Sequence, residues 1–336
     1  MTPVNINGKM VGDGNPTYII AEVGINHNGD VSLAKEMVAA AWESGADAVK
    51  IQTFVTNEFL HPSHPGYKYD IDAEISHKDE QEIWDYAKSH DINLFSTPEE
   101  FKSLAFIAQQ DPALIKIAAM DFNYKDLIQG AAQLQKPIIL SAGMSTLEEV
   151  LQAVRWVEET ENNQYILLHC VSCYPAAPYT CNLRAIQTMK TILNCPVGFS
   201  DHTVGIHIPL AAVALGANVI EKHFTIDKNL PGPDQQCSMD PRDLKTLIRG
   251  IREIEVAFGH GRKVPAPEEE EPRKFKRRGI YAARDLVAGS RLNKSDVVFF
   301  APTRKKSEVT NWDYMLKRVL KKDVKCLEPI TLDDIE

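Results

Sequence analysis

The sequence predicts an α/β protein built as a (β/α)8 barrel, or TIM barrel, followed by a small β-rich domain. Eight short, almost wholly apolar runs follow one another between residues 17 and 224, as expected of parallel strands that are buried on both faces. Amphipathic helix patterns separate these runs, which is the alternation typical of a closed barrel. The rival fold, an open doubly wound sheet, is disfavoured because no G-x-G-x-x-G follows the first run.

The expected strands are runs of five to seven residues, each bounded by polar or turn-forming residues. In order, they are 17–23, 48–54, 92–97, 114–119, 137–143, 165–170, 196–200 and 218–224. Helix patterns lie between them or after the last one, as at 33–46, 78–90, 146–160, 206–217 and 243–258. Gly45, Gly143 and Gly216 stand where helices or turns should end.

The segment AEVGINHNGD (21–30) predicts a tight turn after the first strand. Gly24 permits a sharp change of direction, and Asn28-Gly29 is a strong turn dipeptide. Asp30 is expected to cap the next helix at its N-terminus. We therefore interpret Asn26 and His27 as residues that stabilise the turn, and we do not expect His27 to bind a metal.

The composition changes after Gly261, and this change divides the chain. Residues 1–261 form the predicted barrel domain. The stretch 262–278 is charged and Pro-rich, which indicates a linker. Residues 279–336 contain the short β-like runs 280–286, 297–302 and 318–324 and form the small second domain.

Composition also excludes several functions. A chain of 336 residues with 44% hydrophobic residues can bury a full core, and its net charge of −9 argues against general nucleic-acid binding. No run of about 18 apolar residues is present, so no membrane span is expected. The N-terminus lacks the pattern of a secretory signal, and the six scattered cysteines are typical of reduced cytoplasmic thiols. The lone C-x-x-C of Cys170 and Cys173 lacks the second pair that a zinc ribbon needs.

Two histidines follow neighbouring expected strands. His202 lies in GFSDHT and His223 lies in EKHFT, with a helix-like stretch between them. In a parallel barrel this arrangement brings both imidazoles to the carboxyl ends of adjacent strands, where such folds carry their chemistry. Each histidine alone would be interpreted as a half-buried structural residue. Two in equivalent positions favour a divalent-metal site.

Other strand ends contribute a set of residues suited to a phosphorylated substrate. Lys50 and Lys116 interrupt apolar strands, and Ser141 and Ser200 end two others. Ammonium and hydroxyl groups together bind phosphate well. The carboxylate of Glu22 should lie beside them. Surface lysines are the alternative interpretation, and a Schiff-base aldolase with Lys116 as nucleophile is a rival function.

At this point the motifs resemble the N-acetylneuraminate (sialic acid) synthase family, which includes the related nonulosonic acid synthases. The matching pieces run in order through the barrel: AEVGINHNGD, GADAVKIQTF, FSTP, KPIILSAGM, LLHCVSCYP, GFSDHT, EKHFT and PGPDQQCSM. The tail IYAARDLVAGSRLNKSDV resembles the antifreeze-like (SAF) domain that ends these proteins. The resemblance covers nearly the whole chain.

The resemblance implies a reaction and a set of site residues. Such enzymes condense phosphoenolpyruvate with N-acetylmannosamine or a related hexosamine and release phosphate, using Mn²⁺ or Mg²⁺. The implied metal ligands are His202 and His223, and the implied catalytic carboxylate is Glu22. The implied phosphoenolpyruvate contacts are Lys50, Lys116, Ser141 and Ser200, and the implied sugar contacts are Gln52, Asp121, Tyr174 and Asp234. It also implies a domain-swapped homodimer in which the SAF domain of one chain caps the barrel of its partner.

Several positions differ from the family pattern. Ala119 removes a phosphate donor, Asp121 stands in place of a longer glutamate, and Glu99 stands in place of an aromatic residue. Ser172 replaces an asparagine, a variant common in related synthases. Ala301 stands where the SAF domain normally offers an arginine, for which Arg278 and Arg304 are candidate substitutes.

The differences fall mainly on the sugar side. We therefore expect the phosphoenolpyruvate reaction with an acceptor that need not be N-acetylmannosamine. A non-catalytic sugar-binding or ice-binding protein and a family member without activity stay as alternatives.

Overall fold

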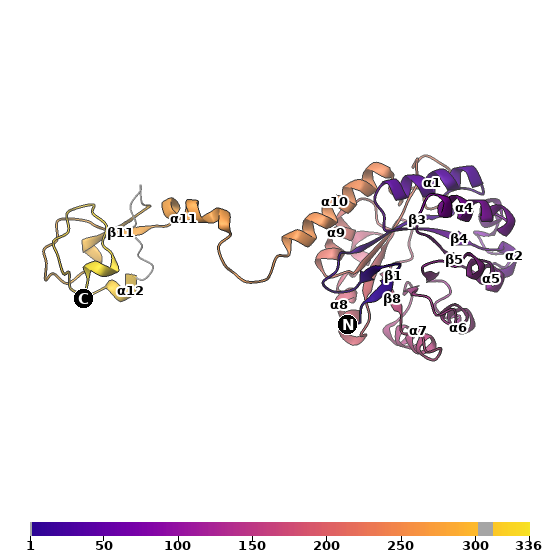
Figure 1. Ribbon diagram of the computed structural model, residues 1–336, viewed down its shortest axis with the longest axis horizontal. Helices are drawn as coiled ribbons and strands as arrows, with labels where there is room; N and C mark the ends of the chain where they lie inside the picture. The colour runs from indigo at the N-terminus through magenta and orange to yellow at the C-terminus, as the bar shows by residue number, and fades with distance from the viewer. Residues whose placement is uncertain (1, 302–311) are drawn as a thin grey trace. The chain divides into compact units, whose positions relative to one another are not determined.

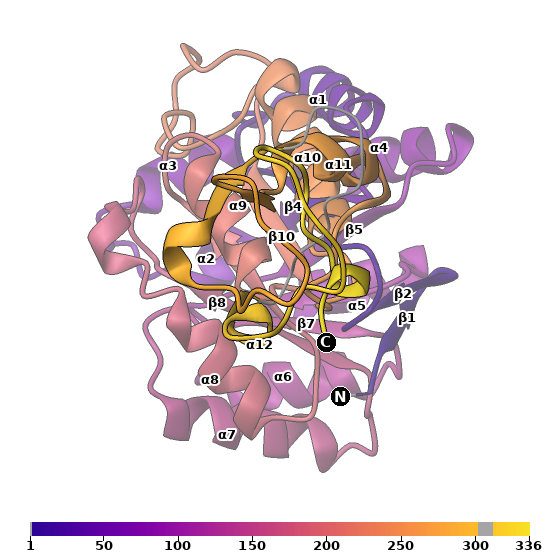
Figure 2. The same cartoon turned by 90° about the vertical axis from the view of Figure 1, so that its left-hand side faces the viewer.

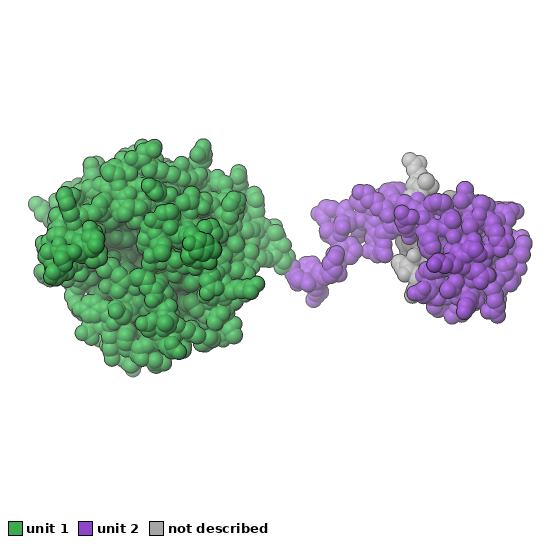
Figure 3. Space-filling model, turned by 180° about the vertical axis from the view of Figure 1, so that it is seen from behind, with its two compact units in different colours: residues 1–259 green, residues 260–336 purple. Residues whose placement is uncertain are grey.

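A computed structural model describes residues 2–301 and 312–336. The chain divides into two compact units, residues 1–259 and 260–336, which Figure 3 shows in separate colours. Unit 1 contains the barrel and unit 2 contains the C-terminal domain.

Eight parallel strands form the barrel of unit 1, which confirms the predicted fold class (Figure 1). They are β3 (Tyr18–Gly24), β4 (Ala48–Thr53), β5 (Leu94–Pro98), β6 (Ile115–Ile117), β7 (Ile138–Ser141), β8 (Tyr165–Cys170), β9 (Val197–Asp201) and β10 (Val219–His223). The hydrogen-bonded order is β5-β4-β3-β10-β9-β8-β7-β6, and β5 and β6 at its two ends contact each other. The ring of strands is therefore almost closed.

The register of the strands brings the polar strand ends together. His223 on β10 pairs with Glu22 on β3, and Glu22 in turn pairs with Lys50 on β4. On the other side, Glu221 of β10 pairs with Ser200 of β9. Because side chains alternate between the two faces of a strand, residues 221 and 223 point to the same face and Lys222 to the opposite one.

A main helix follows each strand and covers the outside of the barrel. These helices are α1 (Val31–Glu43), α4 (His77–Ser89), α5 (Phe101–Gln110), α6 (Lys125–Ala132), α7 (Leu147–Glu158), α8 (Arg184–Ile192), α9 (His207–Ala214) and α10 (Pro241–Ala257). The loop after β4 adds α2 (Thr56–Phe59) and α3 (Tyr67–Ala73), and the loop after β8 adds η1 (Pro178–Thr180). As expected, Asp30 caps α1 by accepting from the backbone N–H groups of Ser32 and Leu33.

The core of unit 1 has two layers. One apolar cluster lies between the strands and the helices, and a second one lies among side chains inside the barrel, including Phe95, Ile139 and Leu168. A hairpin of β1 (Val4–Ile6) and β2 (Lys9–Val11) adds Val4, Ile6 and Val11 to the inner cluster. Figure 2 shows this hairpin as a separate two-stranded ribbon. It shares its cluster with residues at the start of the strands, so it lies at the end of the barrel opposite the polar strand ends.

Unit 2 is built around an antiparallel pair, β11 (Gly279–Ala282) and β12 (Val297–Phe300). The expected run 318–324 enters only as isolated bridges, such as Leu286 with Val324 and Leu320 with Ile335. A small core of its own includes Ile280, Leu292, Met315, Leu320 and Ile330. The remaining elements are η2 (Pro267–Glu269), α11 (Glu270–Lys276), η3 (Lys294–Asp296), α12 (Trp312–Met315) and η4 (Leu332–Asp334). The first two lie within the stretch that we predicted to be a linker.

None of the helices in the described ranges, 2–301 and 312–336, has both the length and the apolar character needed to cross a membrane.

Candidate active site

Four charged side chains form a buried network at the carboxyl ends of the strands. Lys50 Nζ lies 2.6 Å from Glu22 Oε2 and donates to Thr97 Oγ1 at 3.0 Å. Lys116 Nζ donates to both carboxylate oxygens of Glu221, at 2.9 and 3.0 Å. Each of the four residues is less than 5% exposed. Two ammonium groups therefore face two carboxylates, and the network has no net charge.

Glu221 links the two halves of this network, a role that the sequence analysis did not assign to it. It accepts a hydrogen bond from Ser200 Oγ at 2.8 Å, and its Oε2 lies 3.9 Å from Lys50 Nζ. Burial alone would raise the pKa of Glu221, but Lys116 and Lys50 hold it below its usual range. The signal in the sequence was its spacing, because Glu221 stands two residues before His223 on the same face of β10.

The predicted phosphate-binding residues lie in the barrel interior, and one of them has a free donor group. Lys50, Lys116, Ser141 and Ser200 are all 3% exposed. The Ser141 hydroxyl is buried without a hydrogen-bond partner among the described residues. A buried hydroxyl without a partner is costly unless a ligand satisfies it. The site can thus offer an anion two ammonium groups and two hydroxyls, in competition with Glu221.

The two histidines face each other beside the network. Their ring centroids lie 5.2 Å apart. His202 Nδ1 lies 2.8 Å from the carbonyl oxygen of Val171, so Nδ1 carries the proton and Nε2 keeps its lone pair. His223 Nδ1 is buried without a hydrogen-bond partner among the described residues. Burial lowers the pKa of both imidazoles, that of His223 strongly, so both are neutral at pH 7.

These two imidazoles fit a divalent cation, because each is neutral and has a ring nitrogen available. Within the described ranges, no three His, Cys, Asp or Glu side chains converge on a common point. A cation here would therefore take its remaining ligands from water or substrate.

A buried ion pair behind the histidines holds β9 and β10 in register. Lys222 Nζ lies 2.8 Å from Asp201 Oδ2, and neither side chain is exposed. Asp201 precedes His202 and Lys222 precedes His223 in the chain. The pair therefore fixes the backbone next to both imidazoles.

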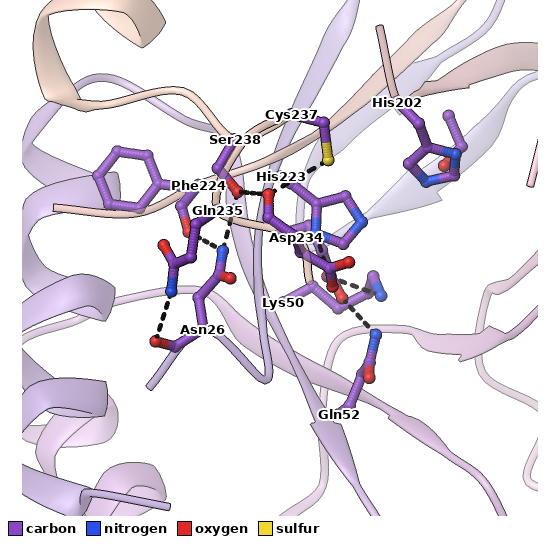
Figure 4. A network of polar contacts seen from close by, with 12 residues as sticks. Asn26, Lys50, Gln52, His202, His223, Phe224, Asp234, Gln235, Cys237 and Ser238 are labelled. Carbon is purple, nitrogen blue, oxygen red and sulfur yellow. Dashed lines mark hydrogen bonds and ion pairs between the residues drawn. The ribbon is translucent and has the colours of Figure 1, made fainter. Parts of the chain in front are cut away.

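Asp234 reaches His223 from the loop after β10 (Figure 4). Its Oδ2 lies 3.6 Å from His223 Nδ1. Asn26, in the turn after β3, anchors this loop by donating to the Phe224 carbonyl and to Ser238 Oγ, both at 2.9 Å. Gln235 donates back to the Asn26 carbonyl at 3.1 Å, so the two loops hold each other. Burial raises the pKa of Asp234 to about 7.

The other predicted sugar contacts surround the same opening. Gln52 donates to Glu22 Oε1 at 3.0 Å. The side chain of Tyr174 is half-exposed, and the centroid of its ring lies 4.1 Å from that of His202. Asp121 lies beyond the end of β6 and is hydrogen-bonded to Glu99, which follows β5. Glu99 was expected only as a departure from the family pattern, and its contact with Asp121 was not predicted.

Some candidate residues lie elsewhere. His27 is buried in its turn, where Nδ1 accepts from the Gly29 backbone N–H at 3.1 Å, as the turn interpretation predicted. In unit 2, Arg278 donates to the carbonyl of Phe299, and Ala301 is exposed. Arg304 lies outside the described residues. Cys170 is buried, Cys173 is exposed, and both are free thiols.

Comparison with known proteins finds two matching family models. A model described as the NeuB family matches residues 37–263, and one described as the SAF domain matches residues 277–336. An uncharacterized protein of Methanocaldococcus jannaschii is 40% identical over 335 residues, covering 100% of this chain and 99% of the relative. The N,N'-diacetyllegionaminic acid synthase of Legionella pneumophila is 40% identical over 316 residues, covering 88% and 89%.

Among solved structures, an N-acetylneuraminic acid synthetase from Leptospira borgpetersenii superposes with a TM-score of 0.76 at 34% identity, covering 82% of this chain and 96% of the other.

Proposed function

This chain belongs to the NeuB family, and from that premise we propose that it condenses phosphoenolpyruvate with an open-chain N-acetylhexosamine-type aldose. The products are a nine-carbon 2-keto-3-deoxy sugar acid and inorganic phosphate. The observation that carries the proposal is the buried set of Lys50, Lys116, Ser141 and Ser200 beside Glu22 and two neutral histidines. It combines an anion site with a carboxylate and a pair of metal-ligand side chains.

The phosphate group of phosphoenolpyruvate binds to Lys50, Lys116, Ser141 and Ser200. Ser141 gains its missing acceptor, while Lys116 and Ser200 turn from Glu221 towards the phosphate. Buried charges without partners are costly, so the two negative charges that the phosphate adds to this neutral network need compensation, which proton uptake by Glu221 or a divalent cation at the two histidines would supply. Burial also strengthens each of these hydrogen bonds relative to water.

His202 and His223 would hold a divalent metal ion, Mn²⁺ or Mg²⁺. When bound, such an ion supplies a positive charge that polarises the aldehyde of the acceptor. The residues contribute neutral ring nitrogens and a fixed orientation, which the Asp201–Lys222 pair and the Val171 carbonyl maintain.

The reaction then joins C3 of phosphoenolpyruvate to the aldehyde carbon, whose oxygen takes up a proton. Water adds at C2 and gives up a proton, and phosphate leaves with cleavage of the C2–O bond. Glu22 is our candidate for orienting or deprotonating this water, because burial raises its pKa and makes the carboxylate a better base. Gln52 and Lys50 hold the two oxygens of Glu22 in place.

The acceptor is proposed as a class. The Legionella relative is named for a product with two N-acetyl groups, so an aldose with two acetamido groups is the first acceptor to test, ahead of N-acetylmannosamine. We further propose a cytoplasmic homodimer in which the SAF domain of one chain caps the barrel of its partner. Light scattering on the intact chain measures the oligomeric state, and a monomer at working concentration would contradict the dimer.

Phosphate release from phosphoenolpyruvate, measured across a panel of aldoses with Mn²⁺ or Mg²⁺, tests the proposed reaction. Mass spectrometry of the product should show the mass of aldose plus pyruvate. No release with any aldose contradicts the function. Borohydride trapping of a keto acid on Lys116, without a need for metal, would instead support the Schiff-base aldolase.

A further inference from the structure

Two adjacent glutamates at the start of α5 have opposite environments. Glu100 caps the helix, accepting from the backbone N–H groups of Lys102 at 2.5 Å and Ser103 at 3.0 Å. Glu99 takes no part in the cap. Its side chain is buried, with a relative exposure of 6%, and its Oε2 receives no hydrogen bond from a donor group of the described residues. One glutamate therefore has a clear role in the fold, and the other does not.

Glu99 is paired with a second carboxyl group, that of Asp121. Asp121 is 8% exposed, and its Oδ2 also lacks a donor among the described residues. Two carboxylates cannot hydrogen-bond to each other unless one of them carries a proton. Burial raises the pKa of Glu99 well above its usual range and that of Asp121 to about 6, so the pair retains one proton near neutral pH.

No lysine neutralises this pair by direct contact within the described ranges. Lys50 is bound to Glu22 and Thr97, and Lys116 is bound to Glu221. Both lysines act on Glu99 only through their charge at longer range. The pair thus keeps a negative charge and spare acceptor oxygens. Burying such groups is costly unless a ligand donates hydrogen bonds to them.

The position of the pair in the barrel indicates which part of the substrate it meets. Glu99 follows β5 and Asp121 follows β6, whereas His202 and His223 lie at the ends of β9 and β10. In the closed strand order, β5 lies four strands from β9, and β6 lies four strands from β10. The acid pair and the histidine pair therefore lie on opposite walls of the barrel opening, with the lysine network between them.

We infer that Glu99 and Asp121 form an acceptor subsite that selects a neutral, hydrogen-bond-donating substituent on the part of the sugar remote from its aldehyde. This inference rests on the proposed function. A hydroxyl or amide N–H donates to the spare oxygens of the pair. A phosphate ester at the far end of the aldose is repelled, because a like charge would enter a poorly hydrated site. The subsite thus distinguishes free aldoses from their terminally phosphorylated forms.

Selectivity is the measurement that tests this inference. Wild type, Glu99→Gln, Glu99→Met and the double variant Glu99→Gln/Asp121→Asn are compared on an acetamido aldose and on its 6-phosphate, with KM and kcat determined for the sugar and for phosphoenolpyruvate. We expect Glu99→Met to raise the KM for the free sugar about ten-fold or more, since a buried acceptor is lost. Glu99→Gln alone leaves the charge on Asp121. The double variant Glu99→Gln/Asp121→Asn removes the charge of the pair and keeps its shape, so it should lower the preference for the free sugar over its phosphate about ten-fold. The KM for phosphoenolpyruvate should stay within about two-fold.

Glu58→Gln is the matched control, because Glu58 is an exposed carboxylate on α2 paired with Lys102. Difference infrared spectra of wild type and Glu99→Gln at neutral pH should also show the loss of one protonated carboxyl group in the variant. Thermal unfolding identifies a variant that fails to fold. If Glu99→Met does not fold, the double variant decides the test.

An active wild type whose sugar selectivity is unchanged in Glu99→Gln/Asp121→Asn would overturn the subsite and leave the proposed function standing. Equal changes in the KM values for sugar and phosphoenolpyruvate would also overturn it, because they indicate a general structural role. A wild type that releases no phosphate with any aldose would overturn both.

Discussion

The two halves of the site differ in how their charges are compensated. On the side predicted to bind phosphoenolpyruvate, Lys50 and Lys116 lie within strands and are paired with Glu22 and Glu221 at 2.6 to 3.0 Å. On the acceptor side, Glu99, Asp121 and Asp234 lie in loops beyond the strands, and the first two carry buried oxygens without donors among the described residues. This difference fits the proposed function, in which a fixed anion site lies next to a sugar site that ligand groups complete.

The largest effect on activity is expected at the histidine pair. His223→Ala removes one of two imidazoles and should lower metal-dependent turnover by about 1000-fold or more, because a lost metal ion removes several kcal/mol of stabilisation. Phosphate release and metal content of the purified protein measure the effect, with the exposed His61→Ala as control. Full activity of His223→Ala in the presence of a chelator would contradict the metal assignment.

Removing one charge from the lysine–glutamate network should lower both the free energy of unfolding and the affinity for phosphoenolpyruvate. Lys116→Met leaves Glu221 buried without its main partner, which costs about 3–5 kcal/mol of unfolding free energy. We expect kcat/KM for phosphoenolpyruvate to fall at least about 100-fold.

Adding Glu221→Gln to Lys116→Met should restore much of the stability but not the activity, because the uncompensated charge is removed while the ammonium group is still missing. Urea unfolding and steady-state kinetics separate the two effects. A double variant that is no more stable than the single one would show that the two charges are not coupled.

Glu80, a titratable carboxyl group, is connected through Thr53 to the loop that carries Glu99. Glu80 on α4 accepts from Thr53 Oγ1 at 2.7 Å and from Trp84 Nε1 at 2.9 Å, and the Thr53 carbonyl accepts from the Glu99 backbone N–H at 3.2 Å. Burial raises the pKa of Glu80 from 4.5 to about 7. The folded state therefore holds a proton that the unfolded state releases, and stability falls as pH rises from the unfolded pKa to the folded one.

We expect this group to cost up to about 3 kcal/mol above pH 7, relative to low pH, from the size of the pKa shift. Glu80→Gln should remove this part of the pH dependence of the unfolding free energy, measured by urea denaturation from acidic to neutral pH. An identical pH slope in the variant would mean that Glu80 titrates normally.

The smallest effect is expected on the KM for the sugar alone. Asn26→Ala removes the two donor hydrogen bonds that hold the Asp234 loop, at a cost of about 1–3 kcal/mol. The KM for the sugar should rise about ten-fold, while the KM for phosphoenolpyruvate stays within about two-fold. Parallel kinetics with each substrate varied in turn provide the comparison. A larger effect on phosphoenolpyruvate than on sugar would show that the two halves are not independent.

The same comparison shows which features the sequence could predict. All eight strands begin and end within two residues of their predicted bounds, because a short, continuous apolar run between turn-forming residues is typical of a strand buried on both faces. The strand-borne side chains Lys50, Lys116 and Ser200 reach a common network because strand ends share one edge. Glu22 and His223 lie side by side for the same reason, and because β3 pairs with β10.

Features that depend on loops or on pairs distant in the chain were missed. The contact between Glu99 and Asp121 joins two loops 22 residues apart (121 − 99), which no periodicity encodes. The hairpin of β1 and β2 was overlooked although Asn7-Gly8 is a strong hairpin signal, because its strands have only three residues each. The tail run 318–324 has β-like composition, but among the described residues it forms only isolated bridges.

The contacts of Glu221 bear on how the enzyme tolerates its own product. Because this carboxylate already binds Lys116 and Ser200, it acts as an internal competitor for any anion that enters the barrel. A small ion such as inorganic phosphate must displace these contacts without the help of further substrate atoms, whereas phosphoenolpyruvate brings a carboxylate as well. Within the proposed function, we therefore expect this counter-ion to weaken the binding of released phosphate more than that of phosphoenolpyruvate, so that product inhibition is weak.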